Sequence, residues 1–127
     1  MSVTATLSGA ITVVDSSSGA QPFTKQLSNL AFIGNVSDIA SSALIGTSPT
    51  TITLPVSPTQ FVYIKNLSAA QTVTVSWTPT SGVLAVVQTL EAGGALLAVN
   101  ISTGAGITTL SATAGIANTP IEYILLG

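Results

Sequence analysis

The sequence contains no cysteine, no histidine and no arginine. Without cysteine there are no disulfides and no thiolate metal sites, a composition that fits the reducing cytosol. Without histidine the chain lacks the most common general base and the imidazole metal ligand. The chemistry open to this protein is therefore narrow from the outset.

Charge of either sign is scarce, because charged residues make up 5% of the chain against about 25% in an ordinary soluble domain. The charged residues are two cations and four anions: Lys25, Lys65, Asp15, Asp38, Glu91 and Glu122. Two separated lysines offer no electrostatic footprint for a phosphate backbone or an anionic lipid surface. We therefore predict that the protein binds neither nucleic acid nor membrane.

Long hydrophobic runs are also missing. The longest weakly polar stretch, "GGALLAVNI" at 93–101, is about half of the ~20 residues that a spanning helix needs. The N-terminal "MSVTATLSGAITVV" has no basic segment and alternates apolar with hydroxyl residues, which does not match a signal peptide. Polarity comes from Ser and Thr, and Thr suits a half-buried pleated surface. One neutral β domain over 1–127 is predicted, and its low charge favours association.

The first part of the chain, 1–46, predicts strands and a loop. In 2–14 apolar residues alternate with polar ones on both sides of Ser8-Gly9, which predicts two short strands around a turn. The run "DSSSGAQP" at 15–22 predicts a loop. Segment 23–34 has no clean period and predicts a strand or irregular structure. Segment 35–46 fits a helix capped by Ser37 or a strand, and its surroundings favour the strand.

The second part, 47–127, predicts the main strands of the domain. In "SPTTITLPV" Ile52 and Leu54 share a face, and the prolines around them suggest an edge or a change of sheet. The stretch "FVYIKNLSAAQTVTVSW" at 61–77 resembles two halves of a β-hairpin. Its first half is apolar on both faces, which predicts that both faces are covered.

The final third continues the pattern. Gly93 and Gly94 in "EAGG" supply the positive-φ positions of a tight connection between "GVLAVVQTL" and "ALLAVN". The last two strands are "GITTLSATAG" and "TPIEYILLG". The predicted fold class is all-β, an antiparallel β-sandwich or jelly-roll of about 8–10 short strands.

No constellation of residues supports catalysis. The serines lack a G-x-S-x-G turn and a histidine, and a glycosidase-type pair of Glu91 with Glu122 would have to be assembled by the fold. Solvated turn or edge residues are the favoured interpretation of both carboxylates. We therefore predict a protein that is not an enzyme, with no cofactor and no metal. The Asn-x-Ser sequons at Asn35, Asn66 and Asn100 are interpreted as turn asparagines.

The order of segments over 47–127 resembles small structural proteins of tailed-bacteriophage virions. In many of these an "F-x-Y-I-K-N" strand precedes a Thr/Val strand and a Gly-containing turn, and a "hydrophobic-E-Y-hydrophobic" strand closes the chain. The resemblance implies a virion location after synthesis in the host cytoplasm. It implies capsid or tail subunits as partners and a homo-oligomer, with a trimer as one form. A capsid decoration (cement) protein is the first reading, and a tail, neck or fibre component is the alternative.

Candidate subunit contacts are aromatic residues and the closing strand. They are Phe61, Tyr63, Trp77, Ile121, Tyr123 and Leu125. The same residues would equally serve as the domain's own core, and that alternative stays open at this point. A carbohydrate-binding β-sandwich is a further alternative, and it requires exposed aromatic side chains.

Overall fold

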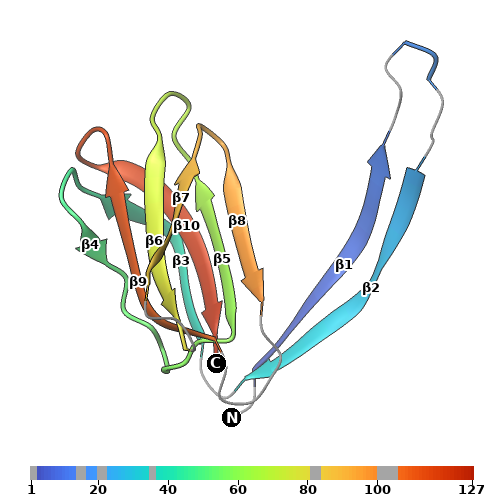
Figure 1. Cartoon of the computed structure of the whole chain (residues 1–127), viewed down its shortest axis with the longest axis horizontal. Helices are drawn as coiled ribbons and strands as arrows, with labels where there is room; N and C mark the ends of the chain where they lie inside the picture. The colour runs from blue at the N-terminus through green and yellow to red at the C-terminus, as the bar shows by residue number, and fades with distance from the viewer. Residues whose placement is uncertain (1–2, 14–16, 20–22, 35–36, 81–83, 100–105) are drawn as a thin grey trace.

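The computed structural model describes residues 3–13, 17–19, 23–34, 37–80, 84–99 and 106–127, and all its regular elements are strands. Eight of them form a sandwich of two four-stranded antiparallel sheets (Figure 1). The all-β prediction is confirmed. The remaining two strands, β1 (Val3–Val13) and β2 (Phe23–Gly34), form a separate antiparallel hairpin.

The first sheet has the order β3-β10-β5-β8. Its strands are β3 (Ser37–Ile45), β10 (Thr119–Leu126), β5 (Phe61–Asn66) and β8 (Ala95–Val99). The second sheet has the order β4-β9-β6-β7. Its strands are β4 (Thr50–Thr51), β9 (Ile107–Ala114), β6 (Val73–Pro79) and β7 (Val86–Leu90).

The pairing order is that of a jelly roll. Among the eight sandwich strands the first pairs with the last, β3 with β10, and the pairs β4 with β9, β5 with β8 and β6 with β7 follow inward. These four strand pairs are joined into two sheets by two further pairings, β10 with β5 and β9 with β6. Such a double Greek key is a way of closing two sheets around one core.

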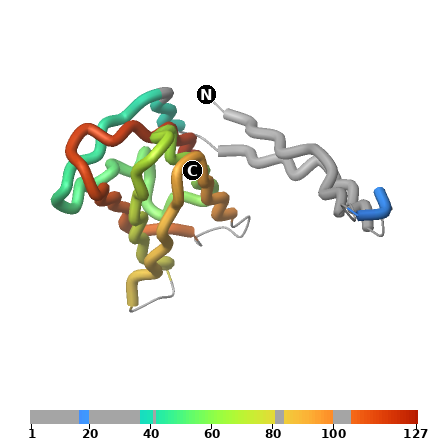
Figure 2. Tube along the Cα trace, turned by 90° about the horizontal axis from the view of Figure 1, so that it is seen from above, coloured from blue at the N-terminus to red at the C-terminus, as the bar shows by residue number. Residues whose placement is uncertain are grey.

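The core lies between the sheets and follows the period-two alternation of their strands. In β5, Val62 and Ile64 are fully buried, and in β6 Val73 and Val75 are their counterparts from the other sheet. Strand alternation places every second residue on this inner face. The buried core consists of Ile45, Ile52, Val62, Ile64, Val73, Val75, Leu90, Ile107, Leu110, Ala112, Ala114, Ile121 and Leu125. Figure 2 shows these strands gathered in one body, seen from above.

Two local predictions need correction. Ser8 and Gly9 do not form a turn, because β1 continues through them and the irregularity there is a register shift between Leu7 and Gly9. Segments 61–66 and 72–77 do not form a hairpin, because β5 and β6 belong to different sheets. The connection between them passes from one sheet to the other instead of reversing within one sheet.

Other local predictions are confirmed. Segment 37–45 is a strand and not a helix, whereas 35–36 lie outside the described residues. Ile52 is buried, and Leu54 packs against the same core. The connection at 91–94 is a turn closed by a hydrogen bond from the Gly94 amide to the Glu91 carbonyl at 2.8 Å. Gly93 has the predicted positive φ, 76°, whereas Gly94 does not, so the prediction is wrong for Gly94.

Candidate interaction surface

The predicted contact residues divide between the core and its margins. Ile121 and Leu125 are 0% exposed and lie in the core, so a neighbouring molecule cannot reach them in this conformation. Trp77 and Tyr123 are partly buried against the same core. These four residues therefore belong to the domain's own core or pack against it, which is the alternative to subunit contacts that the sequence left open. The charge of Glu122 is the sequence signal that assigns 122, 124 and 126 to the other face of the closing strand.

Phe61 and Tyr63 lie on the outer face of the first sheet. They pair across strands with Leu126 and Ile124 of β10, and together these four residues form an apolar cluster separate from the core. Phe61 and Leu126 are buried, and Tyr63 and Ile124 are partly buried. The prediction that both faces of β5 are covered is therefore met, fully on the inner face and in part on the outer one.

Tyr63 also belongs to an apolar row that crosses the outer face of the whole first sheet. The register places Ile39 of β3 beside Ile124, Ile124 beside Tyr63, and Tyr63 beside Leu97 of β8. The two ends of the row are the most open, because Ile39 and Leu97 are exposed. The row supplies continuous apolar surface from one edge of the sheet to the other.

Two tyrosine hydroxyls donate hydrogen bonds to carboxylates on this sheet. Tyr63 donates to Glu122 at 3.1 Å, and Tyr123 donates to Asp38 at 3.3 Å. Burial, and then the hydrogen bond to Glu122, raise the pKa of Tyr63 above its ordinary value. Burial, and then the charge of Asp38, raise the pKa of Tyr123. These bonds orient the carboxylates along the sheet, and both hydroxyls stay protonated in neutral solution.

The edges of the sandwich are protected unequally. A sheet edge offers unpaired backbone groups to other chains, and proteins commonly protect it with charges, prolines, bulges or short strands. On one side, β3 carries Asp38 and a register shift against β10, and β4 has two residues with Pro49 beside it. Such features are typical of an edge that does not pair.

The opposite side has none of these devices in its described strands. The strands there, β7 and β8, contain no charge and no proline, and they pair with their neighbours without a register shift. The turn at 91–94 connects them, so both edges lie on the same side of the sandwich (Figure 1). Their exposed apolar residues, which we name the β7/β8 edge, are Val86, Val87, Leu97 and Val99.

Asn66 is a buried residue at the end of β5, and its side chain holds the start of the turn that connects β7 and β8. It is 0% exposed, and its Nδ2 donates to the carbonyls of Gln71, Leu90 and Glu91 at 2.6, 3.2 and 3.1 Å. Its Oδ1 accepts a hydrogen bond from the Ser68 amide at 3.0 Å. This sequon asparagine therefore joins three segments of the chain by hydrogen bonds, an arrangement that we call the Asn66 clamp, and it is more than a turn residue. Asn35 and Asn100 lie outside the described residues.

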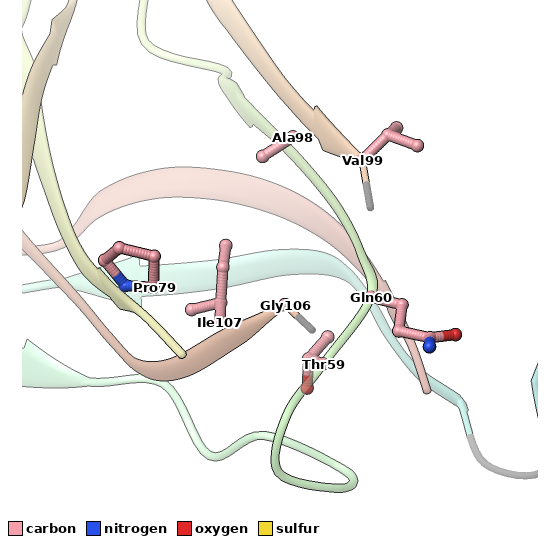
Figure 3. Close-up of a pocket in the computed structure, with 7 residues that line it drawn as sticks. All are labelled: Thr59, Gln60, Pro79, Ala98, Val99, Gly106 and Ile107. Carbon is pink, nitrogen blue, oxygen red and sulfur yellow. The ribbon is translucent and has the colours of Figure 1, made fainter. Parts of the chain in front are cut away.

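A small cavity of about 140 Å³ opens at one end of the sandwich (Figure 3). Beside it, Thr59 and Ile107 exchange two backbone hydrogen bonds of 2.8 Å. The cavity is lined by Thr59, Gln60, Pro79, Ala98, Val99, Gly106 and Ile107. None of these side chains is ionisable, and the Thr59 hydroxyl already donates to the Val56 carbonyl at 2.6 Å, so the lining side chains offer no acid–base chemistry.

Within the described part of the chain, no three acidic, histidine or cysteine side chains gather as a metal site. The same residues include no helix long and apolar enough to span a membrane. Compared with protein-family models, curated proteins and solved structures, the chain matches none of them. The family resemblance therefore stays a prediction from sequence, and the β7/β8 edge is the strongest candidate for a functional surface.

Proposed function

We propose that this chain is a non-enzymatic structural subunit of a tailed-bacteriophage virion, and a capsid decoration protein in particular. The observation that carries the proposal is the β7/β8 edge, which is apolar, uncharged and open to pairing. A protein that circulates as a free monomer gains nothing from such an edge and is exposed to aggregation through it. A subunit built into an assembly has this edge covered by a neighbour.

The composition supports the same function. With four acidic and two basic residues, the chain offers few charge pairs for attraction between subunits. The apolar row through Tyr63 and Leu97 extends the β7/β8 edge onto the outer face of the sheet. Contacts of this kind bury apolar area, and that contribution to association does not weaken in salt.

The fold supports the proposal more weakly. Jelly rolls occur in viral capsid domains, but also in lectins and in other families, and a fold by itself does not imply a function. Among the aromatic residues of the sandwich, Phe61 is buried and Tyr63, Trp77 and Tyr123 are each partly buried. No observation on these residues favours a sugar-binding platform, so the carbohydrate-binding alternative is not carried further.

Two measurements test the proposal. Light scattering on the purified chain at low and high salt should give the mass of an oligomer that persists or tightens as salt rises. Immunogold electron microscopy, with antibody against the chain, should label the capsid exterior of virions of the phage that encodes it. Label confined to the tail would move the protein to the tail, neck or fibre class. Virions without the chain would refute the virion role.

A further inference from the structure

The hairpin of β1 and β2, which we name the arm, is unusually long and stands alone. Its strands have 11 and 12 residues, whereas strands of about 5–6 residues are typical. It forms its own two-stranded sheet, and among the described strands neither β1 nor β2 packs substantially against the sandwich (Figure 1). An isolated two-stranded hairpin is marginally stable in water. The arm therefore needs a partner.

The register of the arm collects apolar residues on one face. Segment 23–34 has no clean period in sequence, but β2 has one more residue than β1 between the pairs Leu7–Leu30 and Gly9–Leu27. This bulge shifts the alternation of β2 by one position, since successive residues of a strand lie on opposite faces. The residues that then share one face are Val3, Ala5, Leu7, Gly9, Ile11, Val13, Phe23, Lys25, Leu27, Leu30, Phe32 and Gly34.

The opposite face of the arm is mostly hydroxyl and small residues. It carries the pairs Thr4–Ile33, Thr6–Ala31, Ala10–Gln26 and Thr12–Thr24. The arm is thus two-sided except at Lys25, which pairs with Ile11 on the apolar face near the end of β1 and is the one charge in its described strands. A charged partner would find almost nothing to pair with. A neutral, apolar partner fits.

We propose that the arm of one copy adds to the free edge of β8 in a second copy of this chain. Among the described strands, nothing pairs with the outer sides of β1 and β2 or with the free side of β8, so backbone hydrogen bonds can extend the sheet by strand addition. With its apolar face toward the core side, the added arm lies near β7, because packed sheets are ~10 Å apart. There it covers Val86, which is exposed and lies on the core face of β7 opposite Trp77.

A second copy is the favoured occupant because each chain carries both halves of the contact. The arm, with 11 residues in β1, is about 36 Å long and about 10 Å wide, so one face covers on the order of 350 Å². In a two-fold dimer that exchanges arms, each copy covers on the order of 700 Å² in one interface, which approaches the ~800 Å² per partner of stable complexes. A ring would place one arm in each interface and cover about half of that area, so the exchanged dimer is the favoured closure.

The contact between the arm and β8 would explain how copies of this chain associate. This inference therefore rests on the self-association in the proposed function, and it does not depend on a location in the virion. The absence of cysteine makes thiol crosslinking specific. Arm variants Thr6→Cys and Ala31→Cys, one for each strand, are mixed separately with a differently tagged Leu97→Cys variant and treated with a short bis-maleimide. The matched control replaces Leu97→Cys with Ile116→Cys, a loop residue of comparable exposure, 55% against 44%.

The expected product is a mixed dimer of an arm variant with Leu97→Cys, at least about tenfold more abundant than with Ile116→Cys. Arm-to-arm products alone would overturn the inference. So would a Thr6→Cys/Leu97→Cys double variant that links only within one chain, since the arm would then fold onto its own sandwich. An oligomer that gives no arm-to-Leu97 product refutes the arm contact and leaves self-association standing. A monomer that gives none refutes both.

Discussion

The side-chain amide of Asn66 lies 3.2 Å from the carbonyl of Leu90, although β5 and β7 belong to different sheets. The same Nδ2 reaches the carbonyls of Gln71 and Glu91. One buried amide therefore ties together the connection that leaves β5 and the turn that enters β8. The geometry of the β7/β8 edge depends on this clamp, because both strands end beside it.

Asn66→Ala should destabilise the fold by about 3 kcal/mol, because it leaves buried carbonyls without their donor. Chemical denaturation, followed by Trp77 fluorescence, measures the change. Gln88→Ala is the control, since that exposed amide donates only to the Thr89 carbonyl, and it should cost less than about 0.5 kcal/mol. Equal effects of the two substitutions would contradict the clamp.

Leu125→Ala and Ile124→Ala should separate the two faces of β10. Leu125 is fully buried in the core, and Ile124 is partly buried in the outer cluster. Truncation in the core should cost about 2–5 kcal/mol, and truncation of Ile124 about 1 kcal/mol. Unfolding midpoints with unchanged m values would measure both. The reverse order would put the wrong face of the closing strand inside.

Gly106→Ala and Gly93→Ala test steric space at two glycines of positive φ, 150° and 76°. A Cβ on Gly106 would collide with the Thr59 carbonyl oxygen, whereas a Cβ on Gly93 meets nothing within 4 Å. Gly93→Ala should cost about 1 kcal/mol from the backbone conformation alone. Gly106→Ala should cost at least about 2 kcal/mol. A smaller loss of stability for Gly106→Ala would mean that the backbone at Thr59 moves aside at little cost in free energy.

Stability should fall above pH 10, since the pKa values of Tyr63 and Tyr123 are raised above the ordinary 10.0. The folded state then holds protons that the unfolded state has released, so the stabilisation is complete below pH 10 and is lost as pH rises. Urea unfolding at several alkaline pH values measures the slope. The Tyr63→Phe/Tyr123→Phe variant should show a shallower slope, and an unchanged slope would exclude both hydroxyls as the source.

Val86→Lys should weaken self-association at least about tenfold, because the added arm would have to bury an unpaired charge in an apolar contact. Charges of this kind are what proteins place on edges that must not pair. Ile116→Lys places the same charge on an exposed loop residue and should leave the association unchanged. Sedimentation velocity over a range of concentrations, with circular dichroism to verify folding, compares the two. Equal association of both variants would exclude the β7/β8 edge as the contact.

Several features of the site could not be predicted from sequence. Whether Ile121 or Ile124 faces the core is a choice between two alternating sets of similar hydrophobicity, and Glu122 was the one sign of the correct set. The exposed apolar residues of β7 resemble a buried strand in sequence, because exposure there follows from the place of β7 at the end of its sheet. In sequence, Asn66 was distinguished only as part of a sequon. Its role could not be predicted, because two of its acceptors, the carbonyls of 90 and 91, are distant in sequence and are brought near by the fold.

The sequence by itself determined that this protein is made of strands, because period-two alternation, β-branched residues and turn residues are local signals. It also determined the near absence of charge. Only the tertiary structure decided which strands pair, because consecutive strands in a jelly roll mostly change sheet, as β5 and β6 do. The bulge that aligns the apolar face of the arm was likewise decided by pairing, since a register exists only between two strands.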